Sequence, residues 1–221
     1  MKVQALLNNG EVSSLIERNW EQISTDFEIA DAAMPTRFMA RTELSFHQYV
    51  KLLGYICLDV WDIPGDIVEI GVWKGKSLTF MSRLVGSTAK VIGIDPCELP
   101  GQPEELAYFQ QILFPQCPIV QRYSQEAIED TLQLSRTFKL LHIDGGHRRE
   151  NVWADFLLFE RFVTPGGYIV FDDYGDYQYS PEVGPAVNRL RDAGLFNEYE
   201  ILGQLPAYEA SYVLRKRDTT I

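Results

Sequence analysis

The chain has 221 residues, of which 31 are acidic and 20 basic, giving a net charge of -11. That charge disfavours nucleic acid and anionic membrane surfaces as partners, and no stretch reaches the roughly 18 apolar residues of a membrane span. Cys57, Cys97 and Cys117 are odd in number and lack the C-x-x-C spacing of a zinc site. We therefore expect a soluble, cytoplasmic protein with reduced thiols.

Residues 1–60 are expected to form an N-terminal helical cap, because apolar side chains recur there at three-to-four spacing. Pro35 interrupts this pattern, and the segment 31–45 around it is either a lid or an ordinary interhelical loop. Arg37 or Arg41 in this segment could capture a ligand carboxylate. Residues 61–221 would then form the main domain.

From residue 61 onward, short β-branched runs alternate with helical patterns. This alternation predicts an α/β fold: a doubly wound, seven-stranded, mostly parallel sheet. The expected strands are 67–70, 90–95, 119–125, 138–144, 167–173, 199–202 and 211–215, and the expected helices are 77–86, 104–113, one through 128–132, 152–162 and 184–193.

A glycine turn follows the first of these strands, in the run Glu-Ile-Gly-Val-Trp-Lys-Gly-Lys-Ser at residues 69–77. Val72 and Trp73 stand where a dinucleotide fingerprint would repeat glycine, and a P-loop needs one more residue between its glycines. The pattern E-x-G-x-x-x-G opens class I methyltransferases, whose ligand S-adenosylmethionine carries an ammonium and a sulfonium. Glu69 suits that ligand, and Ser77 is expected to cap the next helix. A turn that binds nothing is the alternative.

Acidic residues end several of the predicted strands. Asp144, Asp172 and Asp173 would meet at the carboxyl edge of the sheet, where three like charges favour a bound hard cation such as Mg²⁺. His147 lies in a loop beside them and is a candidate general base. Asp95, about two dozen residues beyond Gly71, has the reach of a ribose-binding carboxylate. His142 is expected to be a core residue.

Three runs together resemble the macrocin-type O-methyltransferases, which methylate sugars of natural products: residues 63–77, His-Ile-Asp at 142–144, and Pro-Gly-Gly-Tyr-Ile-Val-Phe-Asp-Asp-Tyr-Gly at 165–175. The resemblance spans about residues 45–190. It implies that Asp144, Asp172 and Asp173 bind magnesium and that Asp95 holds the cofactor ribose. It also implies that Ser124 and Gln125 lie near the adenine, and that the methionine end of the cofactor contacts Glu69 and the loop formed by Lys74, Gly75, Lys76 and Ser77. Further expected cofactor contacts are Gly71, Arg41 and Asp144.

We therefore expect a Rossmann-like class I methyltransferase that moves a methyl group from S-adenosylmethionine to a hydroxyl of a small acceptor, assisted by Mg²⁺. Asp144 or His147 would take the hydroxyl proton. The enzyme could form a homo-oligomer. Two alternatives remain open: a cofactor-binding sensor or partner subunit without catalysis, and a P-loop-like hydrolase.

Overall fold

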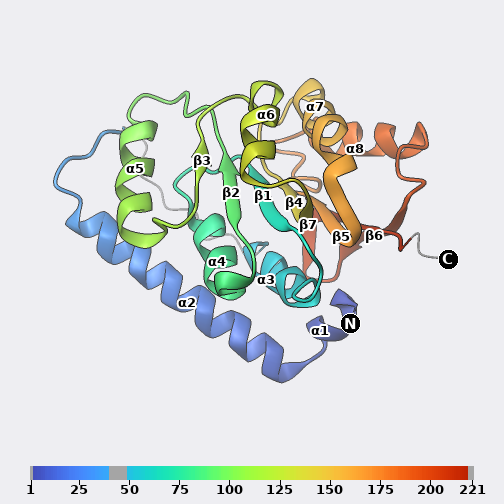
Figure 1. Ribbon diagram of the computed structural model, residues 1–221, viewed down its shortest axis with the longest axis horizontal. Helices are drawn as coiled ribbons and strands as arrows, with labels where there is room; N and C mark the ends of the chain where they lie inside the picture. Colours follow the sequence, from blue (N-terminus) through green and yellow to red (C-terminus); the bar gives the residue numbers. More distant parts are fainter. Residues whose placement is uncertain (1, 40–48, 219–221) are drawn as a thin grey trace.

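The computed structural model describes residues 2–39 and 49–218, which form one seven-stranded sheet between two layers of helices (Figure 1). The strand order is β3-β2-β1-β4-β5-β7-β6. Strand β7 runs antiparallel to both β5 and β6, and all other neighbouring pairs are parallel. This confirms the predicted doubly wound sheet of seven mostly parallel strands. The strands are β1 (Asp66–Ile70), β2 (Val91–Ile94), β3 (Ile119–Val120), β4 (Phe138–Ile143), β5 (Val163–Phe171), β6 (Tyr199–Leu205) and β7 (Tyr208–Lys216).

The helices divide between the two faces of the sheet. One face is covered by α1 (Val3–Leu7), α2 (Gly10–Ala33), α3 (Val50–Asp59), α4 (Lys76–Val85) and α5 (Gln102–Leu113). The other face is covered by α6 (Ser124–Leu134), α7 (Arg149–Phe159) and α8 (Val183–Asp192), and the short 3₁₀ turns η1 (Gly86–Thr88) and η2 (Glu160–Phe162) follow α4 and α7. Within the described residues, no helix is both long and apolar enough to cross a membrane.

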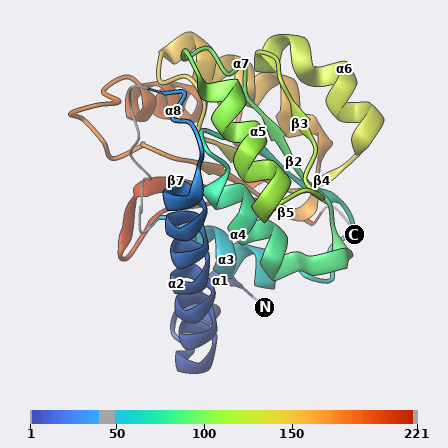
Figure 2. The same cartoon turned by 90° about the vertical axis from the view of Figure 1, so that its left-hand side faces the viewer.

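Helix α2 is the longest helix and lies alongside α4 and α5 (Figure 2). Its first turn is capped by Asn9, whose Oδ1 accepts hydrogen bonds from two backbone amides, and it ends just before Pro35. Its buried stripe includes Trp20, which meets Phe80 of α4 edge to face with ring centroids 5.5 Å apart. The pattern confirms the predicted N-terminal helices and the break at Pro35.

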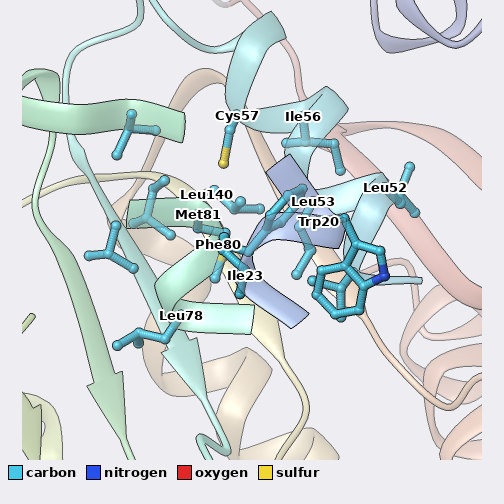
Figure 3. Close-up of a cluster of buried hydrophobic side chains, with 14 of the residues drawn as sticks. Trp20, Ile23, Leu52, Leu53, Ile56, Cys57, Leu78, Phe80, Met81 and Leu140 are labelled. Carbon is cyan, nitrogen blue, oxygen red and sulfur yellow. The ribbon is translucent and has the colours of Figure 1, made fainter. Parts of the chain in front are cut away.

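The core beneath these helices is a single cluster. Side chains from α2, α3, α4 and β4 point toward one another in Figure 3, so the N-terminal helices share their packing with the sheet. This is the arrangement that burying an amphipathic stripe requires. The division of the chain into two domains at residue 60 stays a prediction.

The alternation of side chains along β1 and the backbone hydrogen bonds just past the strand ends determine which residues meet at the edge of the sheet. Ile67 packs toward α2–α4, whereas Val68 packs toward α6–α8. Just past the strand ends, the Gly71 amide donates to the Ile94 carbonyl (2.8 Å), that of Asp144 to Ile70 (2.8 Å), and that of Asp172 to Ile143 (2.9 Å). The first residues after β1, β4 and β5 therefore lie side by side at one edge.

Several predicted boundaries were wrong. Strand β3 ends at Val120 instead of 123–125, because Ser124 already begins α6. Helix α4 begins at Lys76, after Gly75 in the left-handed conformation, so Ser77 lies inside the helix and does not cap it. Strand β5 begins at Val163, and a register irregularity between β4 and β5 accommodates Pro165.

Candidate active site

A cavity of about 880 Å³ opens at the carboxyl edge of the sheet, a size typical of small-molecule sites. Its walls come from the loops after β1, β2, β4 and β5, the start of α6, the β6–β7 hairpin and Tyr49 before α3. The site residues that the sequence predicted and that line it are Gly71, Asp95, Ser124, Gln125, Asp144, His147, Asp172 and Asp173.

The glycines of the turn after β1 are required by protein packing. Gly71 has φ +89°, and a Cβ there would lie 2.0 Å from the backbone oxygen of Asp144. Gly75 has φ +83°, and its Cβ would lie 2.2 Å from the ring of Phe114. Both distances are far below van der Waals contact, so any larger residue would move the neighbouring chain. Gly75 does not line the cavity.

Asp95 holds the glycine turn in place. Its Oδ2 accepts hydrogen bonds from the amides of Val72 (2.8 Å) and Trp73 (3.0 Å), and its Oδ1 from the amide of Cys97 (2.7 Å) and the side chain of Gln102 (3.2 Å). Four N–H donors use the acceptor capacity of a carboxylate. The structure therefore gives Asp95 a positioning role, and its predicted contact to the ribose stays a prediction.

Glu69 is turned away from the cavity. It lies opposite His142 on the neighbouring strand, both side chains are fully buried, and Glu69 Oε1 is 2.9 Å from His142 Nδ1. Among the described residues, Glu69 Oε2 and His142 Nε2 have no hydrogen-bond partner. His142 is thus the core residue that the sequence predicted, and Glu69 is its partner in the core.

The other charged residues of the turn also face the protein interior. Lys74 pairs with Glu105 at 2.9 Å, and both side chains are buried. The Lys76 ammonium lies 4.6 Å from the centroid of the Trp20 ring, and burial lowers the pKa of Lys76 to about 7. Lys76 therefore packs against α2, and Ser77 is buried in the first turn of α4. Lys74, Lys76 and Ser77 do not line the cavity.

Asp144 and Asp172 form the floor of the cavity. Tyr49 donates a hydrogen bond to Asp144 Oδ2 at 2.9 Å, and Ser211 donates to Asp172 Oδ1 at 3.0 Å. Burial is the main cause that raises the pKa of each carboxyl well above its usual value. Repulsion adds to it, from Asp173 in the case of Asp144 and from Asp144 in the case of Asp172. Burial and the Asp144 charge raise the pKa of Tyr49, which therefore remains a hydrogen-bond donor.

His147 forms a cluster with Asp144 and Asp173. Its Nε2 lies 3.0 Å from Asp173 Oδ2, its Nδ1 lies 2.8 Å from Ser180 Oγ, and Ser180 also donates to Asp173 Oδ2 (2.8 Å). One ligand atom each from Asp144, His147 and Asp173 lie within 4.8 Å of one another, a spacing that could hold a metal ion. Asp172 lines the same cavity outside this group, so its predicted role as a ligand stays a prediction.

Helix α7 contributes a further buried acid to the lining of the cavity. Ser124, at the start of α6, donates a hydrogen bond to Asp155 of α7, and burial raises the pKa of Asp155 to about 6. Both line the cavity, as does Gln125. The predicted contact of Ser124 and Gln125 with an adenine is consistent with this position but stays a prediction.

The charged side chains in the described lining of the cavity are mainly acidic. Eight carboxyl residues line it, and the described part of the lining contains no lysine or arginine: the acids are Asp95, Glu98, Asp144, Asp155, Asp172, Asp173, Asp176 and Glu209. Arg41, predicted to contact the cofactor, lies outside the described residues. Such a cavity favours cationic ligands and disfavours phosphates.

Sequence reasoning missed Tyr49 and Asp155. In the sequence, Tyr49 falls within the apolar pattern of the predicted helical cap, and Asp155 lies in a helix, away from any strand end. Neither position carries a local motif. Only the packing of α3 and α7 against the sheet edge brings these side chains to the cavity.

Comparisons with known proteins identify a methyltransferase domain in the chain. Residues 68–174 match the family described as "Methyltransferase domain". The uncharacterized protein R132 of Acanthamoeba polyphaga mimivirus is 40% identical over 172 residues, which cover 73% of this chain and 77% of R132.

Two solved structures share the fold at low identity. The O-methyltransferase NovP is 19% identical with a TM-score of 0.63, covering 76% of this chain and 79% of NovP. The calicheamicin methyltransferase CalS11 is 17% identical with a TM-score of 0.62, covering 99% of this chain and 98% of CalS11. The chain therefore belongs to the same family as R132 and carries a methyltransferase domain of the class I fold.

Proposed function

We propose that the protein is an S-adenosylmethionine-dependent O-methyltransferase that acts on a hydroxyl of a small molecule with the help of a hard divalent cation. The observation that carries this proposal is the cavity of a methyltransferase domain with eight carboxyl residues in its lining and no described lysine or arginine.

The charge of the cavity supports S-adenosylmethionine over phosphate-bearing cofactors. Its sulfonium and ammonium are both cations, and each carboxylate near them lowers their energy. NAD and ATP would instead bring several negative charges toward the same acids. Gly75-Lys76-Ser77 does not favour the P-loop alternative, because Lys76 packs on Trp20 on the helical side of the turn.

The donor set fits a divalent cation. Asp144, Asp173 and His147 are close enough to share one ion, and Asp172 is near enough to interact electrostatically with Asp144 and Asp173. Carboxylate oxygens suit Mg²⁺, and one imidazole also admits Mn²⁺. When bound, such a cation would lower the pKa of an acceptor hydroxyl and orient it.

The chain's own residues account for the remaining requirements of methyl transfer. The reaction forms a bond between the acceptor oxygen and the methyl carbon as the carbon–sulfur bond breaks, with its electron pair staying on sulfur. The acceptor oxygen must be aligned with that bond and lose its proton. Asp144 or His147, which both face the cavity, would take the proton.

The acceptor is proposed to be a hydroxylated sugar or other natural product without phosphate groups. The part of the cavity formed after β5 contains Asp176 and Tyr177, and Gln204 and Glu209 come from the β6–β7 hairpin. These side chains can hydrogen-bond hydroxyls and pack against a ring, whereas the two acids would repel a phosphate.

Transfer of a labelled methyl group tests this proposal directly. We expect incorporation from [methyl-¹⁴C]S-adenosylmethionine into members of a panel of hydroxylated small molecules, loss of it with EDTA, and recovery with Mg²⁺ or Mn²⁺. Full activity in EDTA would refute the role of the cation, and transfer only to nitrogen or carbon acceptors would refute the O-methyl assignment.

A further inference from the structure

Tyr49 reaches the candidate active site from outside the matched methyltransferase segment. It precedes α3, whereas the match begins at residue 68. Its hydroxyl lies 2.9 Å from Asp144 Oδ2, its ring centroid lies 6.0 Å from that of His142, and it lines the cavity. Tyr49 therefore links the N-terminal helices to Asp144, the residue that follows β4.

We propose that Tyr49 is a positioning residue, which orients the Asp144 carboxylate so that its other oxygen is available to the cation of the reaction. This inference rests on the proposed function. Among the described residues, Oδ2 of Asp144 accepts the tyrosine hydrogen bond, while Oδ1 accepts none. Tyr49 therefore distinguishes the two otherwise equivalent oxygens.

Asp144 needs such a partner because little else fixes its side chain. The terminal torsion of aspartate is broad, and the next two residues, Gly145 and Gly146, have no side chains to pack against it. Repulsion from Asp173 also acts on the carboxylate. Metal sites require ligands held within about 0.5 Å and 10–20° of the productive geometry, and a fixed hydrogen-bond donor supplies this restraint.

Tyr55 on the same helical segment provides a matched control. Its hydroxyl donates a hydrogen bond of equal length, 2.9 Å, but to Ser13 Oγ. Tyr55 is buried and does not line the cavity. Tyr49→Phe and Tyr55→Phe therefore each remove one hydroxyl, and with it the hydrogen bond to Asp144 in the first variant and to Ser13 in the second.

The test is Mn²⁺ binding, followed by electron paramagnetic resonance in the presence of S-adenosylhomocysteine. Tyr49→Phe should weaken Mn²⁺ binding by roughly 10- to 100-fold, as loss of partners to metal ligands does, with S-adenosylhomocysteine affinity within about twofold of wild type. Tyr55→Phe should leave the Mn²⁺ affinity unchanged. Tyr49→His, which keeps an N–H donor, should recover part of the affinity.

Three results would overturn the proposal: Mn²⁺ affinity within twofold of wild type in Tyr49→Phe, an equal loss in Tyr55→Phe, or no difference between Tyr49→Phe and Tyr49→His. Thermal unfolding of each variant shows whether a loss of Mn²⁺ affinity comes from misfolding. If Tyr49→Phe does not fold, the Mn²⁺ affinity of Tyr49→His is compared with that of Tyr55→Phe instead. A wild-type protein that binds no Mn²⁺ would refute the cation part of the proposed function and the Tyr49 role with it.

Discussion

The two charged segments at the carboxyl edge of the sheet use their side chains in opposite ways. In the glycine turn, residues 69–77, the charged groups point into the protein: Glu69 pairs with His142 and Lys74 with Glu105. In the carboxylate edge, formed by Asp144, Asp172 and Asp173, they line the cavity, and burial together with repulsion from the neighbouring acids raises the pKa of Asp144 and of Asp172. Similar residue types thus pair in the protein interior in the first segment and line the cavity in the second.

The difference arises from what lies behind each segment. The glycine turn is covered by α2, α4 and α5. A charged side chain there is buried and is stable only next to a partner, as Lys74 is next to Glu105. The carboxylate edge follows β4 and β5, where the described lining supplies no cation. Mutations in the first segment should therefore affect stability, and those in the second should affect ligand binding.

Asp144→Asn should give the largest effect, a loss of Mn²⁺ affinity of about 1,000-fold, equivalent to about 4 kcal/mol. The fold should survive and gain stability from relieved repulsion. Asp176→Asn is the control, because Asp176 lines the cavity outside the 4.8 Å cluster. Equal Mn²⁺ binding by the two variants, measured by electron paramagnetic resonance, would mean that net charge alone matters.

Lys74→Met should lower the free energy of unfolding by about 3 kcal/mol or more, because Glu105 would remain buried without its cation. Lys51→Met is the control: Lys51 pairs with Glu17, whose side chain is half exposed, and its loss should cost about 1 kcal/mol or less. Urea unfolding measures both. A folded Lys74→Met protein of normal stability that fails to bind S-adenosylhomocysteine would instead place Lys74 in the cofactor site.

Asp155→Asn should change how stability depends on pH. The folded protein keeps the Asp155 proton up to about pH 6, whereas the unfolded chain releases it near its ordinary pKa of 3.8. Stability from this group is therefore complete below about pH 4 and falls as pH rises to 6, by at most about 3 kcal/mol. In the variant this loss is absent. The free energy of unfolding, measured by denaturation at pH values from 4 to 7, should therefore fall less steeply with pH than in wild type. Parallel curves would contradict the assignment, and Asp130→Asn, at a surface ion pair, should match wild type.

Lys76→Met should give the smallest effect on ligand binding. Because Lys76 packs on Trp20 and not in the cavity, the affinity for S-adenosylhomocysteine should change by less than about twofold. Calorimetric titration checks this. A tenfold loss in a variant of unchanged stability would show that the glycine turn reaches the cofactor through its lysines after all.

The sequence was sufficient for the fold because strand runs and helical stripes each follow a local period. It also predicted the carboxylate edge, since acids that end parallel strands share one edge. The predicted cofactor contacts of the glycine turn stay a prediction. The sequence did not show that Lys74 contacts Glu105 and Lys76 contacts Trp20, because these contacts depend on the packing of α5 and α2. Tyr49 and Asp155 depend in the same way on tertiary contacts, which no local pattern encodes.

The central claim is that this acidic cavity binds an adenosyl ligand that carries an ammonium group and no phosphate, and titration calorimetry with wild-type protein tests it most directly. S-adenosylmethionine and S-adenosylhomocysteine should bind with dissociation constants in the micromolar range, whereas ATP and NAD should bind at least about 100-fold more weakly, a difference of about 2.7 kcal/mol. Binding of ATP or NAD tighter than either adenosyl ligand would contradict the account.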